Sequence, residues 1–272
     1  MSIYYMMKPW GKQKGYELDP VLNKNSWEAI QWAAQQGLAP STWNVGDMKY
    51  VILNGVVGGK TFLNQIVFVY ILGFNHNASV EGNNTIHFGC AMSGSKRIAF
   101  CDSSYGSNGS TAAFRMNTTN TNKNGWSGSY MRNTIIPAFI NAMPSDLQSA
   151  LKAVTKYTDN ANATSHNTKS YVTATQDKAF LLAEWEIFGT RTYANQYEKN
   201  SQAQYDYYKN VATTSTSRRM YKDNATSTAA HWHGRSPYYA NGTGFCRVYA
   251  DGSTFNSEAH YSYGFAPAFV VG

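Results

Sequence analysis

The sequence predicts an α+β fold in which two helices pack against a mixed, mostly antiparallel sheet with long loops. Charged residues make up only 14% of the 272 residues, against roughly 25% in an ordinary soluble domain. Aromatic residues reach 15%, and much of the polarity comes from Asn, Ser and Thr, which suit strands and turns better than long helices. Hydrophobic residues make up 43%, which is enough for a sizeable core.

The N-terminal part of the chain is predicted to be separate from the rest. Residues 27–36 have a helical pattern of apolar residues, with Ser26 as N-cap and Gly37 at the end. The run Pro40-Ser41-Thr42 then marks a break after this helical pattern. We therefore predict an attachment or oligomerisation segment at 1–42 and a larger domain at 43–272.

Strands are predicted where β-branched and aromatic residues form alternating or continuous apolar runs. These runs lie at 49–53, 65–74, 85–88 and 178–182, and short strands joined by Gly-rich turns follow from residue 229. The dipeptide Asn54-Gly55 predicts a type I′ hairpin turn after the first strand.

Helices and loops are predicted between these strands. In chain order they are a surface loop at 101–128, helices at 129–143 and 145–156, a polar loop at 158–177, a strand-to-turn segment at 184–189 and a helix or loop at 193–210. The helix at 145–156 is expected to begin with a capping box formed by Ser145 and Gln148.

The charge distribution argues against nucleic acid as a partner. The net charge is +7, but the basic residues are scattered, and the densest group, Arg218-Arg219 with Lys222, is too short for a nucleic-acid stripe. No apolar stretch approaches the ~20 residues that span a bilayer, so no membrane insertion is expected. Residues 1–20 lack the apolar core of a signal peptide, so we expect no Sec export.

Metal sites, cofactors and a disulfide framework are not expected. Cys90, Cys101 and Cys246 are odd in number and far apart. His231 and His233 would point to the same face of a strand, but no convincing further ligands lie nearby, so two surface histidines beside a buried Trp232 are the favoured interpretation. The tail also lacks the clustered acidic residues that calcium requires.

Enzymatic activity is not expected either. The sequence has no nucleophile elbow, P-loop or zinc-protease motif. Glu184 and Glu186 are two residues apart, and a carboxylate pair for glycoside cleavage remains open on that basis. The simpler interpretation is that they cap or pair with backbone donors. An enzyme acting on cell-surface polysaccharide is therefore the third hypothesis.

The C-terminal tail has the composition of a binding surface. Residues 235–263 concentrate Tyr, Asn, Ser and Gly, which give rigid aromatic contact area and adaptable hydrogen bonds. The alternative is that these residues only fill β-turns. The predicted ligand-binding residues are Tyr238, Tyr239, Asn241, Arg247, Tyr249, Phe255, Asn256, Glu258, His260, Tyr261 and Tyr263.

An ordered set of motifs runs through residues 43–272. They are Trp43-x-Val45-Gly46-Asp47, Ile71 to Asn77, Ile86-His87-Phe88, Trp126-x-x-Ser129-Tyr130-Met131-Arg132, Pro144 to Leu147, Leu181 to Gly189, Trp232-x-x-Arg235-Ser236-Pro237, Phe245-Cys246-x-Val248, Asp251-Gly252 and Gly264 to Phe269. Together they resemble a C-type-lectin-like domain of gut bacteria and their phages. One departure is Trp232-His233-Gly234, where that family usually has Trp-Trp or Trp-Leu.

This resemblance implies a C-type-lectin-like fold, similar to that of the variable tail proteins of phage diversity-generating retroelements. In those proteins a Tyr-, Asn- and Ser-rich C-terminal segment meets the host ligand. The implied function is a virion or tail-associated adhesin, a receptor-binding protein for a bacterial cell-surface protein or glycan. Formylglycine-generating enzymes share the fold, but Cys246 has no second cysteine beside it.

The same resemblance gives expectations about assembly, and it implies synthesis in the cytoplasm of a bacterial host. Residues 1–42 would contact other virion proteins, and the protein would be a homo-oligomer. A trimer is suggested by analogy with other phage proteins alone. The alternative function is a structural virion decoration protein without a free ligand, whose aromatic residues would be buried against neighbouring subunits.

Overall fold

The computed structural model describes residues 15–108, 113–160 and 166–272, and their architecture is mixed α+β, as predicted. They form one eight-stranded sheet, one three-stranded sheet and one two-stranded sheet. The prediction of two helices is wrong, because the described part of the chain contains nine α-helices. Most of the additional ones are single turns within segments that are rich in polar residues.

The main sheet has the strand order β1-β2-β3-β4-β8-β9, and β13 pairs with both β3 and β7. The strands are β1 (Met48–Val57), β2 (Lys60–Phe74), β3 (Ile86–Ser93), β4 (Lys96–Ala99), β7 (Ala179–Leu181), β8 (Met220–Lys222), β9 (Ala225–Ala230) and β13 (Pro267–Val271). Only the β4–β8 pair among them is parallel, so the mostly antiparallel sheet is confirmed for the described residues. The last strand therefore returns to the centre of the sheet.

The N-terminal helix forms where the sequence predicts it. Helix α1 (Trp27–Gln35) begins at Ser26, whose Oγ accepts a hydrogen bond from the Ala29 amide at 3.1 Å, and Gly37 follows it in the left-handed region with φ 71°. A single 3₁₀ turn, Leu22–Lys24, precedes α1, and the short helix α2 (Ala39–Thr42) follows it.

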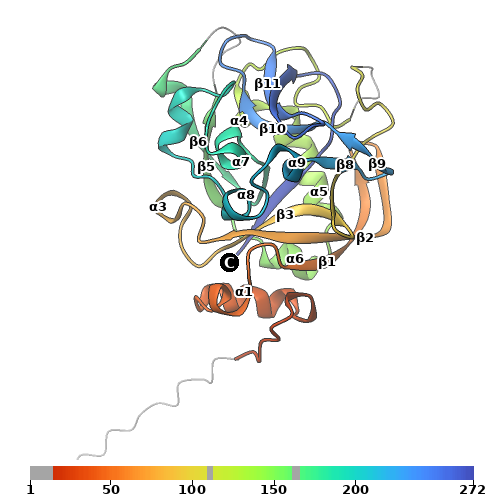
Figure 1. Ribbon diagram of the computed structural model, residues 1–272, viewed down its shortest axis with the longest axis vertical. Coiled ribbons are helices and arrows are strands. Elements are labelled where there is room, and N and C mark those ends of the chain that lie inside the picture. The colour runs from red at the N-terminus through yellow and green to blue at the C-terminus, as the bar shows by residue number, and fades with distance from the viewer. Residues whose placement is uncertain (1–14, 109–112, 161–165) are drawn as a thin grey trace, which may run out of the picture.

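Helix α1 shares the hydrophobic core of the sheet. The Trp27 ring is 3% exposed and packs edge-on against Phe88 of β3 and Phe269 of β13, with ring centroids 5.4 and 6.2 Å apart. Figure 1 shows α1 at the end of the molecule below β1 and β2. The boundary predicted after residue 42 therefore divides residues that pack into one core.

The first hairpin turns four residues later than predicted. Asn54-Gly55 lies inside β1, where the register with β2 shifts between Leu53 and Gly55. The turn is made by Gly58 and Gly59, with φ angles of 56° and 82° that favour glycine. The Asn-Gly pair thus forms an irregularity in a strand, and the Gly-Gly pair after it makes the turn.

The central helical region differs in part from the prediction. The described elements are α4 (Gly125–Gly128), a π-helical turn (Met131–Ile135) continuous with α5 (Ile136–Ala142), and α6 (Ser145–Ala150). The helix predicted at 129–143 is confirmed, whereas the one predicted at 145–156 ends at Ala150. Pro144 is its N-cap without a side-chain hydrogen bond, so the predicted capping box is wrong.

Two strands replace the end of that helix and part of the loop predicted at 158–177. They are β5 (Val154–Asp159) and β6 (Val172–Asp177), which pair antiparallel. The residues of β5 alternate between buried and half-exposed sites, and the buried Lys156 belongs to an ion-pair network. The loop predicted at 101–128 is not purely a surface segment, because Phe114, Met116 and Trp126 are fully buried.

The remaining elements join these layers. They are α3 (Ala78–Glu81), the 3₁₀ turn Lys169–Tyr171, α7 (Glu184–Phe188), the 3₁₀ turn Gln196–Asn200, α8 (Asp206–Asn210) and α9 (Ser215–Arg218). The strand-to-turn prediction for 184–189 is wrong, because α7 is helical and ends at Gly189 in the left-handed region. No helix of the described residues is long and apolar enough to cross a membrane.

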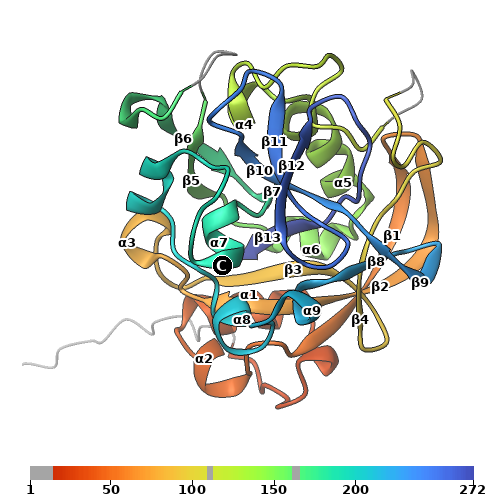
Figure 2. The ribbon, with the colours of Figure 1, turned by 45° about the horizontal axis from the view of Figure 1, so that its top comes forward.

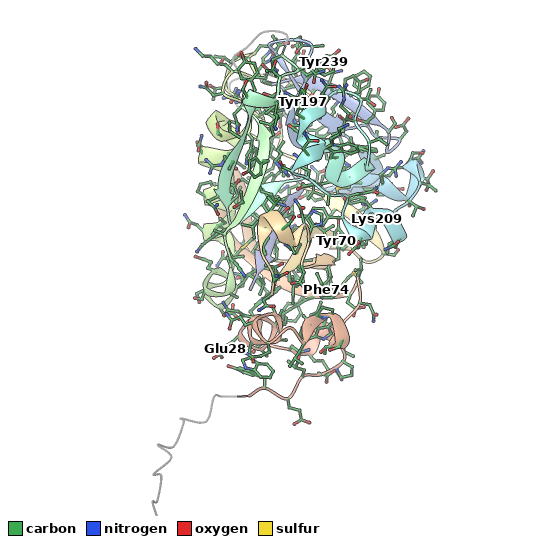
Figure 3. All side chains as sticks on the ribbon, turned by 90° about the vertical axis from the view of Figure 1, so that its left-hand side faces the viewer. Glu28, Tyr70, Phe74, Tyr197, Lys209 and Tyr239 are labelled. Atoms are coloured by element: carbon green, nitrogen blue, oxygen red, sulfur yellow. The ribbon has the colours of Figure 1, made fainter. Side chains whose placement is uncertain are left out.

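A second, smaller sheet lies at the end of the molecule opposite α1. It consists of β10 (Trp232–Pro237), β11 (Gly244–Val248) and β12 (Thr254–Glu258), in that order. In Figure 2 these strands lie above the main sheet, and α1 and α2 lie below it. Figure 3 shows the same polarity, with Tyr239 at one end and Glu28 at the other.

The outer face of the β1–β2 hairpin exposes a group of apolar side chains. Ile52 and Ile66 are cross-strand partners, with exposed fractions of 41% and 62%. Leu63 and Val56 are exposed to 78% and 60%. Large exposed apolar groups of this kind are typical of a surface that contacts another protein.

All three cysteines of the chain are buried and free. Cys90, Cys101 and Cys246 are each 2% exposed, and none forms a disulfide. Burial raises the pKa of the Cys101 thiol to about 12 and raises the pKa values of the other two as well.

Candidate ligand-binding surface

In the sheet β10-β11-β12, the strand register places residues of one face side by side. His233, Arg247 and Phe255 pair directly across the three strands, so their side chains leave the same face. Tyr249 follows Arg247 by two residues at the end of β11 and borders the same face.

A continuous row of rings crosses this end of the molecule, and we call it the aromatic row. Neighbouring ring centroids in it are 4.2 to 6.1 Å apart. In order its members are Tyr239, Tyr238, Tyr193, Phe255, Tyr249, His231, Tyr263, Tyr261 and His260. Seven of them are predicted ligand-binding residues, so the structure brings most of the predicted set together.

The other predicted residues have different positions. Asn241 shapes the β10–β11 turn, since its Oδ1 accepts hydrogen bonds from the amides of Thr243 and Gly244 at 3.1 and 2.8 Å. Asn256 pairs with Cys246 and therefore shares the opposite face of the sheet from Arg247. Glu258 is exposed, with its carboxylate 3.7 Å from the Nδ1 atom of His260.

Two members of the aromatic row were not in the predicted set. His231 is predicted to be a surface histidine beside the buried Trp232, and its Nδ1 atom accepts a hydrogen bond from the Ala250 amide at 3.2 Å. Tyr193 comes from a distant part of the chain. The Glu184 carboxylate holds it in place by accepting hydrogen bonds from the Tyr193 and Ala194 amides at 3.0 and 2.7 Å and from Thr254 Oγ1 at 2.5 Å.

Arg247 lies under the aromatic row. Its side chain is 8% exposed, and its guanidinium carbon is 4.4, 5.2 and 5.4 Å from the ring centroids of Tyr263, Phe255 and Tyr249. Its Nε and Nη1 atoms are buried without a hydrogen-bond partner among the described residues. A cation between aromatic faces is stabilised by the rings, but its N–H groups still require acceptors.

A cleft of about 330 Å³ opens beside this guanidinium. It is lined by Arg247, Tyr249, Asp251, Ser253 and Phe255. Tyr249 and Phe255 are 39% and 41% exposed and present ring surface to it. The cleft lies at the small end of the roughly 300–1,000 Å³ typical of ligand pockets.

His233 lies beneath the surface and does not fit the prediction of two surface histidines. It is fully buried, and its Nε2 atom is 3.1 Å from the Phe114 carbonyl oxygen. Trp232 is buried, as predicted. Burial, followed by the charge of Arg247, lowers the pKa of both His231 and His233 to about 4, so both imidazoles are neutral at pH 7.

This pKa predicts an acid sensitivity of the fold. The imidazole titrates near 6.5 when unfolded, so between pH 6.5 and about 4 the unfolded chain binds a proton that folded His233 does not. The contribution of neutral His233 to stability is thus complete above pH 6.5 and is lost as the pH falls. We expect the free energy of unfolding of a His233→Phe variant to fall less between pH 7 and 4 than that of the wild type, by up to about 3 kcal/mol. Urea titrations at each pH measure this difference, and parallel pH curves for the two proteins would contradict it.

A buried ion-pair network supports the sheet from below. The Arg235 guanidinium of β10 donates to both oxygens of Glu186 in α7, at 2.5 and 2.9 Å, and Lys156 donates to Glu186 and to Glu81 at 3.0 and 2.6 Å. Burial alone would raise the pKa of Glu186, but the charges of Arg235 and Lys156 hold it well below its usual range. Burial raises the pKa of Glu81 to about 7 despite Lys156.

The network includes the one set of potential metal ligands among the described residues. Ligand atoms of His76, Glu81 and Glu186 lie within 4.8 Å of one another. The Lys156 ammonium bonds to both carboxylates, so it already supplies the positive charge that a metal ion would bring. His76 stacks on Tyr205 at 3.6 Å, and burial lowers its pKa to about 3. These residues therefore form a structural network.

The contacts of Glu184 and Glu186 match the simpler of the two interpretations given above. Glu186 accepts from the Ala183 amide at 2.9 Å and from Arg235, and Glu184 binds the backbone near Tyr193. Both carboxylates are buried, with exposed fractions of 2% and 0%. Neither faces the cleft beside Arg247.

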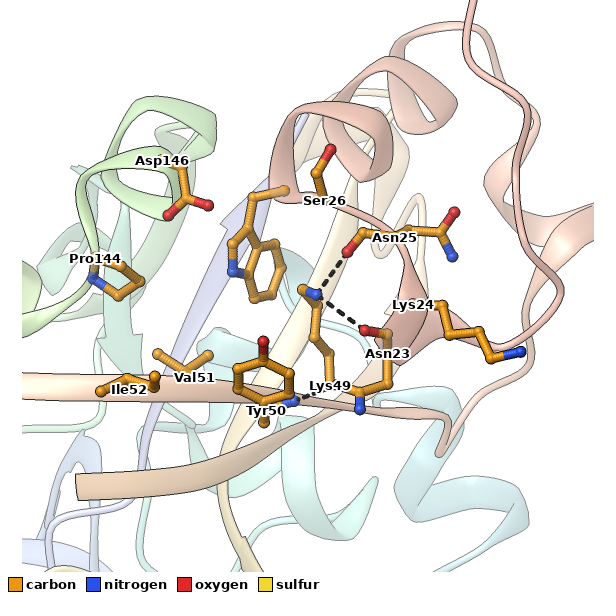
Figure 4. A pocket seen from close by; sticks show the side chains of 11 residues that line it. Asn23, Lys24, Asn25, Ser26, Lys49, Tyr50, Val51, Ile52, Pro144 and Asp146 are labelled. Carbon is orange, nitrogen blue, oxygen red and sulfur yellow. Dashed lines mark hydrogen bonds between the residues drawn. The ribbon is translucent and has the colours of Figure 1, made fainter. Parts of the chain in front are cut away.

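A second hollow, of about 440 Å³, lies at the opposite end of the molecule between α1, β1 and α6 (Figure 4). Its cation is Lys49, whose ammonium donates to the backbone carbonyls of Asn25 and Asn23 at 2.6 and 3.4 Å. These bonds join the N-terminal segment to β1. We therefore assign this hollow a structural role.

Comparison with known families concerns the region that contains the aromatic row. The model of a family described as a domain of unknown function, DUF6273, matches residues 106–272. The chain belongs to the DUF6273 family. No curated protein and no solved structure matches the chain significantly.

The DUF6273 region contains the whole candidate surface and most of its support. The aromatic row, Arg247, the cleft and the Arg235–Glu186 pair all lie within it. The strands β1–β4 precede it in the chain, yet β13 of the DUF6273 region pairs with β3. The family region therefore completes its sheet with strands from outside it.

Proposed function

We propose that this protein is a receptor-binding protein, an adhesin exposed on a phage virion or its tail, that recognises a bacterial surface ligand. The observation that carries the proposal is the aromatic row beside an unpartnered, buried arginine. Tyrosines and arginines are enriched among residues that dominate binding energy. The row lies on a sheet braced by buried ion pairs, and such rigid support favours recognition.

We further propose that the fold is C-type-lectin-like and related to the variable tail proteins of diversity-generating retroelements. Two features support this. The last strand, β13, returns to the main sheet, and the small sheet β10–β12 with its loops stands apart from it. The Tyr- and Asn-rich segment falls on that small sheet, which is the position that the resemblance implies.

Partner contacts belong, in this proposal, to the other end of the molecule. The segment around α1 lies at the opposite end of the molecule from β10 and β11 (Figure 1), and the apolar outer face of β1–β2 belongs to the main sheet, not to the small sheet β10–β12. They would contact other virion proteins or further copies of the chain in a homo-oligomer. The same apolar face also favours the second candidate function, a structural decoration protein held in the particle by this surface alone.

Cell binding tests the proposal. A fusion of green fluorescent protein to the N-terminus is incubated with a mixed gut bacterial community, and labelled cells are sorted and identified. We expect a defined subset of cells to be labelled. Replacing Tyr249, Phe255 and Tyr261 with alanine should reduce the apparent affinity at least about 30-fold, because single anchor residues contribute about 2 kcal/mol or more.

The control is Tyr50→Ala, which removes a tyrosine with 44% exposure from β1 at the opposite end. It should leave labelling unchanged. Equal labelling by the triple variant and the wild type would rule out the aromatic row as the binding surface. No labelled cells with any variant would favour the decoration protein.

A further inference from the structure

The chemistry of the ligand is indicated by the unmet hydrogen-bonding capacity of Arg247. A buried guanidinium without acceptors carries a desolvation cost. Here both Nε and Nη1 lack partners among the described residues, and the Nε–H group shares one planar edge of the guanidinium with Nη2. That edge matches the two oxygens of a carboxylate.

Arg247 forms no ion pair with any residue in the described part of the chain. None of the ion pairs found there includes Arg247. Asp251 borders the cleft, but it is exposed and its Oδ1 accepts hydrogen bonds from the amide and hydroxyl of Ser253 at 2.8 and 2.6 Å. The neighbouring imidazoles, His231 and His233, are neutral at pH 7. The Arg247 guanidinium therefore carries a positive charge that no ion pair of the described residues neutralises.

The residues that line the cleft indicate which kind of molecule bears the carboxylate. Tyr249 and Phe255 expose ring faces beside the guanidinium, and Ser253 and Asp251 add polar groups at the rim. A pyranose ring has one apolar C–H face that packs on aromatic rings and hydroxyl groups at its edge that form hydrogen bonds. The small cleft accommodates a single such ring better than a folded protein segment.

We propose that the cleft binds a uronic-acid residue of a bacterial surface glycan, with its carboxylate accepting from Nε and Nη2 of Arg247. The sugar face packs on Tyr249 or Phe255. Because Nε is buried and the guanidinium packs against these rings, one exposed ring turns aside as the acid enters, a side-chain motion on the ps–ns scale. This inference rests on the proposed function and specifies its ligand.

Calorimetry with oligogalacturonides and oligoglucuronides tests the proposal on the full chain. We expect the wild type to bind at least one of them, and Arg247→Gln to bind it at least about tenfold more weakly, since hydrogen bonds to charged groups contribute roughly 1.5–3 kcal/mol. The wild type should bind the carboxyl-reduced form of the same oligosaccharide as weakly as Arg247→Gln binds the oligouronide. Arg191→Gln is the matched control, because its guanidinium also stacks on a tyrosine of the aromatic row, Tyr239, at 5.0 Å, but has a backbone acceptor at 3.1 Å.

A second measurement applies even when Arg247→Gln fails to fold. In the wild type, the Arg247 Nε–H NMR resonance should shift on addition of the oligouronide and not on addition of its carboxyl-reduced form. An unshifted resonance, or equal affinity of Arg247→Gln and wild type, would overturn the assignment.

The outcomes separate this inference from the proposed function. Labelled cells without affinity for any oligouronide would overturn the uronic-acid assignment and leave the adhesin proposal standing. Oligouronide binding that depends on Arg247, without labelled cells, would support the site and contradict the adhesin. An aspartate-rich peptide that binds as tightly as the oligouronide would overturn the choice of a glycan.

Discussion

An Arg235→Met variant is expected to lose about 3–5 kcal/mol of its free energy of unfolding, because removing one partner of a buried ion pair leaves an uncompensated charge. Arg235 is fully buried and donates to Glu186, to Thr158 Oγ1 at 2.8 Å and to the Leu181 carbonyl at 2.9 Å. Methionine fills part of the space but satisfies none of these acceptors. Urea denaturation followed by tryptophan fluorescence measures the loss.

The matched controls separate charge from packing. Lys199→Met removes one positive charge from an exposed site and should change stability by no more than about 0.5 kcal/mol. The double variant Arg235→Met/Glu186→Gln removes both charges of the pair, so its loss should be smaller than the sum of the two single losses. Additive losses would show that Arg235 and Glu186 are not energetically coupled.

A Trp27→Ala variant is expected to lose about 3–5 kcal/mol, which is typical of a large aromatic side chain removed from a core. The ring packs against β3 and β13, and the Lys49 ammonium lies 5.4 Å from its centroid. The variant should still unfold in one transition, because the N-terminal helix belongs to the same core as the sheet. Differential scanning calorimetry measures both the loss and the number of transitions.

Trp32→Ala is the control, since this tryptophan lies on the same helix and is only half-buried. Trp32→Ala should lose clearly less of the free energy of unfolding than Trp27→Ala. A near-zero effect of Trp27→Ala, or a separate early transition for α1, would instead support an N-terminal segment that folds independently of the domain.

The parts of the fold that the sequence predicts well are those with a local physical cause. Helix α1 has a serine cap and a terminating glycine, and β2 has a long β-branched run. The turn predicted at Asn54-Gly55 is wrong because the Gly58-Gly59 pair further along the chain makes the turn instead. The sequence predicts residues 154–156 as helix because Pro144 to Leu147 favours the start of a helix, but pairing with β6, about 20 residues further on, makes them a strand.

The sequence predicts part of the candidate site, because many of its residues are close together in the chain. Tyr238 to Tyr263 lie in one stretch of the chain, and their composition indicates a binding surface. Tyr193 enters the aromatic row only because Glu184 holds its backbone beside Thr254, a contact between distant residues. The available signal was the Tyr-rich composition of 193–210. That Arg247 forms no ion pair with another described residue is a three-dimensional property that spacing does not reveal.

The burial of Cys90, Cys101 and Cys246 gives a practical route to spectroscopy of this surface. Thiols react as thiolates, and buried thiols with raised pKa values react slowly. A cysteine introduced by Ala250→Cys, between the cleft-lining residues Tyr249 and Asp251, would then be the one readily labelled thiol on the native protein. A maleimide fluorophore at that position would report occupancy of the neighbouring cleft in real time without removal of any native cysteine.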